Sequence, residues 1–87
     1  MQHSEKLARI RHSVARIFRA YGVSDDEPSV ETILIRDGFY CGHRFTCGGL
    51  RAVWFLEEDV IKVFGGDGEF LQATHVDEMI QAPRKAA

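Results

Sequence analysis

The sequence is poor in cysteine and in long apolar runs. Its two cysteines, Cys41 and Cys47, are too few for a disulfide scaffold. On one extended strand they would stand roughly 20 Å apart, beyond disulfide reach, so we expect two reduced thiols. No apolar stretch approaches the roughly 18–20 residues that cross a bilayer. Residues 1–4 run straight into a charged segment and not into a secretory apolar core. We therefore expect a cytoplasmic protein without a membrane partner.

The chain also lacks recognisable catalytic and cofactor signatures. The glycine run 65–68 is a turn and not a phosphate-binding loop, because no helix of the required kind follows it. Cys41 and His43 carry metal-ligand side chains on one side of a strand, but structural zinc usually takes four ligands, often from two close pairs. Apolar neighbours such as Phe45 and Trp54 disfavour a thiolate nucleophile. We expect buried thiols and a core histidine, with no enzyme activity, cofactor or metal.

The composition is that of one globular domain spanning residues 1–87, with 45% hydrophobic and 28% charged residues. The net charge of −2 is unevenly placed. Residues 1–22 hold five bases and one acid, whereas the remainder holds six bases and twelve acids. We interpret this asymmetry as internal complementarity, with a basic helix lying near acidic loops. A basic face that binds a polyanion is the alternative.

Apolar residues recur at intervals of three and four near the N-terminus, which predicts an amphipathic helix over residues 4–21. Ser4 can cap its start and Gly22 can end it. Three arginines fall on the face opposite the apolar stripe: Arg9, Arg16 and Arg19. The apolar stripe consists of Leu7, Ile10, Val14, Ile17, Phe18 and Tyr21.

Glycine turns divide the middle of the chain into short strands. After a loop over 22–29, the turns predict strands at 30–36, 39–46, 50–57, 60–64 and 69–73. Thr74 and Asp77 resemble a capping box for a short helix over 75–82, followed by a tail at 83–87. The predicted fold class is α+β. An N-terminal amphipathic helix packs on a 4–5-stranded antiparallel β-meander within 30–73, and a short C-terminal helix follows.

Two-residue turns set a register that divides this sheet into two faces. We expect the helix to cover the richer face, which comprises Leu34, Cys41, His43, Phe45, Cys47, Leu50, Ala52, Trp54 and Leu56. The second face collects Ile33, Ile35, Tyr40, Val53 and Phe55. Glu31, Arg44, Arg51 and Glu57 border it. An apolar patch with a charged rim usually marks an interface.

Two classes of function fit these surfaces. The first is a non-enzymatic protein-interaction module, a homodimer or a binder of another protein, that uses the second face or an edge strand. The alternative is a single-stranded nucleic-acid or regulatory binding domain. It would use Arg9, Arg16 and Arg19 on the helix, or Arg44 and Arg51 beside sheet aromatics that stack bases. The order of elements over residues 4–73 resembles that of Sm-like ring proteins, but no residue matches that family's signature, so the resemblance implies no site.

Overall fold

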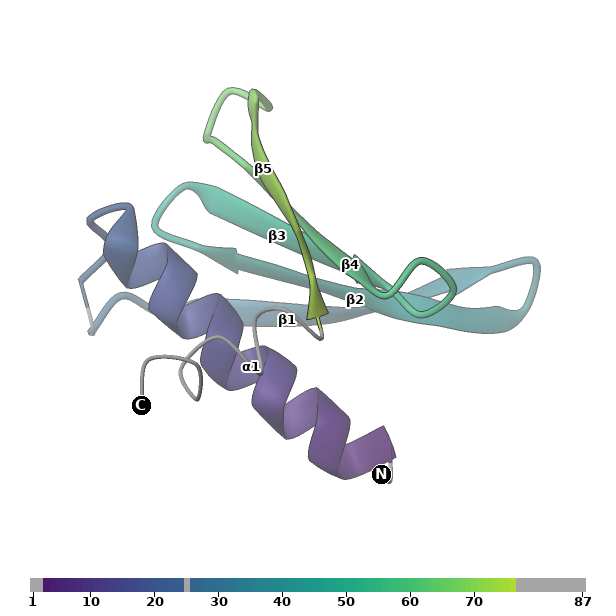
Figure 1. The fold of residues 1–87 in the computed structure, drawn as a ribbon. Coiled ribbons are helices and arrows are strands. Elements are labelled where there is room, and N and C mark those ends of the chain that lie inside the picture. Colours follow the sequence, from purple (N-terminus) through teal and green to yellow (C-terminus); the bar gives the residue numbers. More distant parts are fainter. Residues whose placement is uncertain (1–2, 25, 77–87) are drawn as a thin grey trace.

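The computed structural model describes residues 3–24 and 26–76, which form one helix and one sheet. The helix α1 spans His3–Ala20. The strands are β1 (Ser29–Arg36), β2 (Phe39–Cys47), β3 (Leu50–Phe55), β4 (Val60–Phe64) and β5 (Phe70–His75). They pair in the order β1-β2-β3-β4-β5, each antiparallel to the next. Figure 1 shows α1 lying along one face of this twisted meander. The predicted α+β class is confirmed.

Most of the predicted apolar stripe of α1 faces the sheet, because Leu7, Ile10, Val14 and Phe18 are buried. Tyr21, predicted as its last residue, lies beyond the helix and is 43% exposed. The helix ends where Gly22 adopts a φ of 95°, a left-handed conformation that favours glycine. There the amide of Val23 donates to the carbonyl of Phe18 across 3.0 Å. This bond closes the helix in the manner of a Schellman motif.

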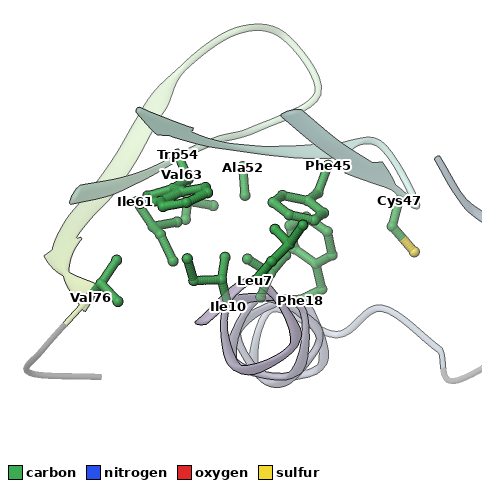
Figure 2. Close-up of a cluster of buried hydrophobic side chains, with 11 residues drawn as sticks. Leu7, Ile10, Phe18, Phe45, Cys47, Ala52, Trp54, Ile61, Val63 and Val76 are labelled. Carbon is green, nitrogen blue, oxygen red and sulfur yellow. The ribbon is translucent and has the colours of Figure 1, made fainter. Parts of the chain in front are cut away.

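The core lies between α1 and the sheet face that we expected the helix to cover (Figure 2). Trp54 is 1% exposed and Ile10 on the helix is equally buried. The sheet contributes Phe45, Cys47, Ala52, Trp54, Ile61 and Val63 to this cluster. Fully burying such side chains contributes roughly 1.5–3 kcal/mol each. The helix is therefore held mainly by apolar contact.

The two tight hairpins are those that the glycine turns predicted. Asp37 and Gly38 have φ of 52° and 82°, and Gly48 and Gly49 have φ of 56° and 84°. Positive φ at both turn positions is typical of type I′ turns, whose twist matches that of the flanking strands. Between β2 and β3, the predicted pairs His43–Trp54 and Phe45–Ala52 are present.

The β1–β2 register differs from the prediction beyond the first few residues. Ile35 pairs with Tyr40 but Leu34 pairs with Gly42, so Cys41 is an extra residue at a β-bulge. A bulge inserts one residue into one strand and changes the side to which the following residues point. Leu34 therefore leaves the helix face, and Ile33 joins it opposite His43. Glu31 pairs with Phe45 on the helix face and not with Arg44.

The predicted helix over 75–82 is wrong at its start, because His75 ends β5 and pairs with Val60. Val76 is buried in the core, and its amide donates to the carbonyl of Asp59 across 3.0 Å. Residues 77–82, like the tail at 83–87, lie outside the described residues. Within the described part of the chain, no helix has the length and apolar character that a membrane span requires.

Candidate functional site

The outer strand β1 carries several exposed apolar side chains. β1 is eight residues long and, among the described strands, pairs only with β2. Its side chains Val30, Ile33 and Ile35 are 61%, 59% and 59% exposed. The strand contains neither lysine nor proline, which natural proteins commonly use to protect a sheet edge. We name this surface, Val30, Ile33 and Ile35 with the backbone between them, the β1 edge.

An ion pair fastens β1 to the helix. Nε and Nη2 of Arg11 donate to the two carboxylate oxygens of Glu31 at 2.7 and 2.9 Å. Such a two-pronged pair fixes direction as well as distance. The hydrogen bonds from Arg11 hold the pKa of Glu31 below its usual range, against the opposing effect of burial. The bulge makes this pair available, because it turns Glu31 toward α1.

His43 lies beside this pair, buried between aromatic rings. Its ring stacks with those of Trp54 and Phe45 at centroid separations of 6.0 and 6.2 Å. Nδ1 of His43 lies 2.9 Å from a carboxylate oxygen of Glu31, but it has no aligned hydrogen-bond partner. Burial lowers the pKa of His43, although Glu31 acts in the opposite direction. The ring is therefore favoured in its neutral form.

The N-terminal turn of α1 is fastened in the same region. His3 Nε2 and the hydroxyl of Tyr40 share a hydrogen bond of 2.9 Å, and the His3 ring stacks on Trp54. Lys6 donates to Asp59 across 2.8 Å, and Asp59 also accepts from Nε1 of Trp54 at 3.1 Å. Burial would raise the pKa of Asp59, but these two hydrogen bonds outweigh it and lower the pKa.

The sequence predicted a basic helix near acidic loops. Asp59, in the turn between β3 and β4, fits this prediction, whereas Glu31 lies on β1. These contacts use Lys6 and Arg11, which flank the apolar stripe. A histidine beside a carboxylate is also found in catalytic pairs, but a general base must reach its substrate. Here the His43 side chain is 5% exposed and Arg11 already holds Glu31. We assign this cluster the structural role of fixing β1 and β2 to the helix.

The second face of the sheet carries a shallow basic hollow. Its volume is about 460 Å³, and its lining includes four cationic side chains and no acidic one. The cations are Arg36, Arg44, Arg51 and Lys62. Between them lie apolar side chains that include Leu34, Val53, Phe55 and Phe64. The guanidinium of Arg51 lies 5.6 Å from the centre of the Phe64 ring, within cation–π distance. We name this surface the basic hollow.

The five residues predicted as one apolar interface are divided between two surfaces. Ile33 and Tyr40 lie on the helix side, since Ile33 pairs with His43 and Tyr40 contacts His3. Ile35 pairs with Tyr40 at the exposed edge. Val53 and Phe55 remain on the second face and line the basic hollow, to whose rim Ile35 also contributes. The bulge at Cys41 causes this division.

The predicted polyanion-binding arginines fall on opposite sides of the molecule. Arg9, Arg16 and Arg19 are exposed on α1, away from its buried stripe. Arg44 and Arg51 line the basic hollow, where they are joined by Arg36 and Lys62. Sequence reasoning missed the last two. Lys62 could have been found by extending the register to β4, because it pairs with Val53, which in turn pairs with Arg44.

The cysteines show no metal-binding arrangement. Both are free thiols. Cys41 Sγ donates to the carbonyl of Leu34 at 3.4 Å, and Cys47 Sγ to that of Glu27 at 3.6 Å. Within residues 3–24 and 26–76, no group of three histidine, cysteine or acidic side chains is placed to hold a metal ion.

Comparisons of this chain with protein-family models, with curated proteins and with solved structures find no match. The fold defines the class: one amphipathic helix on one face of a five-stranded antiparallel meander, with an apolar edge and an uncovered basic face among the described residues.

Proposed function

We propose that this protein is a cytoplasmic, non-enzymatic interaction module that forms a homodimer through the β1 edge. The observation that carries the proposal is the exposure of Ile33 and Ile35, both 59%, on an eight-residue strand at the limit of the sheet. Such a strand presents a row of backbone donors and acceptors to another strand. Two free thiols fit a reducing compartment.

A second copy suits this edge because β1 can pair with itself through its exposed isoleucines. In an antiparallel pair centred on Leu34, Ile33 lies opposite Ile35 of the partner subunit. Arg36 then lies opposite the partner's Thr32, and Glu31 opposite the partner's Asp37, a like-charged pair at the end of the ladder. Apolar cross-strand pairs of this kind each contribute roughly 0.2–1 kcal/mol. A two-fold axis produces every such contact twice.

Charge disfavours the second face as the surface of self-association. Stacking two copies through the basic hollow would place Arg44, Arg51 and Lys62 against the same cations of the partner. Like charges brought together and removed from water destabilise an interface by several kcal/mol. At the β1 edge the like-charged pair of Glu31 and Asp37 stands at the exposed end of the ladder, and Glu31 is already paired with Arg11.

The oligomeric mass tests this proposal. At high micromolar concentration, light scattering should give about twice the 9.9 kDa of one chain, with little dependence on salt because apolar contacts are not screened. Ile33→Lys should restore the monomer, since it places a buried cation at the centre of the interface. Phe70→Lys is the matched control, because Phe70 is 57% exposed on the opposite edge strand. A wild-type chain that stays at the monomer mass, or a dimer unaffected by Ile33→Lys, would overturn the proposal.

A further inference from the structure

We infer that the basic hollow binds a single strand of nucleic acid. The chain as a whole has a net charge of −2, yet the hollow gathers four of its eleven lysines and arginines and no acid. A cluster of positive side chains attracts anionic ligands to its surface even when the whole chain carries a negative net charge. The ligand of this surface is therefore anionic.

The spacing of the cations favours a chain of phosphates over one anion. Arg44 and Lys62 pair with the same residue, Val53, from opposite sides. Their backbones are thus two strand spacings apart, roughly 10 Å, so the cations form a row across the sheet. Arg51 lies on β3 between them, two residues before Val53 on the same face of the sheet, and pairs with Phe64. Cations distributed across three strands suit successive phosphates.

The floor of the hollow favours a nucleic acid over an acidic peptide. Phe55 and Phe64 are half-buried among the cations. Aromatic rings interleaved with basic side chains are the elements with which proteins bind single strands, because bases stack on the rings while the cations contact phosphates. A duplex keeps its bases stacked internally and would leave the rings unused. A peptide of aspartate and glutamate would also leave them unused.

The neighbouring residues leave this surface open. Among the described residues, the helix lies on the other face of the sheet (Figure 1). Three acids, Asp37, Glu57 and Glu58, line an adjoining hollow that shares Arg36 and Phe55 with this one. Of these, Glu58 lies 3.3 Å from Lys62. This pair is exposed and spaced i, i+4, so it contributes little and can be exchanged for a phosphate contact. The hollow is complete in one chain, so this inference does not depend on the β1 edge.

The test is fluorescence anisotropy with a labelled oligo(dT) of roughly 12 nucleotides, a length within the range of small single-strand modules. About three phosphate contacts should weaken binding about 20-fold between 50 and 200 mM salt, since each contact contributes a slope near −0.7 for single strands. The double variant Arg44→Gln/Arg51→Gln should bind at least tenfold more weakly and show a smaller slope. Phe64→Leu should weaken binding about fivefold without changing the slope, because it removes stacking and no phosphate contact.

The matched control is Arg9→Gln/Arg16→Gln, which removes the same charge from the exposed side of α1. It should leave the affinity within about twofold of wild type. The inference is overturned if oligo(dT) does not bind at low salt, or if the helix variant is the one that loses binding. It is also overturned if a duplex or a poly-glutamate peptide of equal charge binds as tightly. The last result would identify an acidic protein as the partner.

Discussion

Gly42→Ala should be among the most damaging single-methyl changes in this protein. Gly42 lies on β2 opposite Phe55, and a Cβ at this position would collide with the carbonyl oxygen of Trp54. It would also lie 3.1 and 3.2 Å from two further backbone atoms of β3. None of these atoms belongs to a side chain that can turn aside. The two strands must therefore move apart where the core tryptophan is held.

The size of the effect follows from this geometry. Overpacking a well-packed site costs about 1–3 kcal/mol, and a collision with backbone belongs at the upper end, about 3 kcal/mol. A domain of this size has a urea m-value of about 1 to 1.5 kcal/mol/M. The midpoint of urea unfolding should therefore fall by about 2 to 3 M. A loss of about 3 kcal/mol is a large share of the roughly 5–15 kcal/mol by which a typical domain is stable.

Far-UV circular dichroism is the suitable assay, because the emission of Trp54 would itself respond to a change at its neighbour. Gly65→Ala is the matched control. A Cβ at Gly65 meets nothing nearer than 3.5 Å, which is ordinary contact distance. If the two variants shift the midpoint equally, or if Gly42→Ala shifts it by less than about 0.5 M, the close approach of β2 and β3 is wrong.

Three further predictions concern the core and its charged fastenings. Trp54→Ala should lower the free energy of unfolding by about 3–5 kcal/mol, because Trp54 is 1% exposed; a loss under about 1 kcal/mol in urea titration would contradict its burial. Since burial lowers the pKa of His43 below 6.5, the unfolded chain takes up this proton first, and stability should fall as the pH drops below about 7 through the folded pKa. Proton NMR of the histidine ring measures that pKa, and a value above 6.5 would reverse the sign. Arg11→Met should raise the pKa of Glu31 toward its ordinary 4.5, as measured by carbon-detected NMR, while lowering stability by at most about 1 kcal/mol because the pair is largely exposed.

The helix and the hairpin turns were predictable because each rests on a local signal. The 3.6-residue spacing of Leu7, Ile10, Val14 and Phe18 identifies the buried face wherever the helix lies. Asp37-Gly38 and Gly48-Gly49 supply the positive φ that a two-residue turn requires. These signals also determine the β2–β3 register, since nothing interrupts the pairing between Cys47 and Gly42.

The division of the predicted apolar patch was not predictable in the same way. The turn at Asp37-Gly38 sets the register only until the first extra residue, and alternation of side chains does not reveal the bulge at Cys41. A hint was present, because the two predicted strands flanking this turn, 30–36 and 39–46, differ in length by one residue. The bulge moves Ile33 to the helix side and leaves Val53 among cations. In place of the single apolar face that the sequence predicted, the sheet therefore has two surfaces, the β1 edge and the basic hollow.

Amide hydrogen exchange of β1 at low and high protein concentration tests the proposed edge pairing most directly. If two chains join through the β1 edge, the outward amides of residues 29–36 should become protected as concentration rises, because they donate to the partner strand. The amides of β5 should not change, and Ile33→Lys should abolish the effect. Protection of β1 that is independent of concentration, or that rises at β5 instead, would contradict the proposed homodimer.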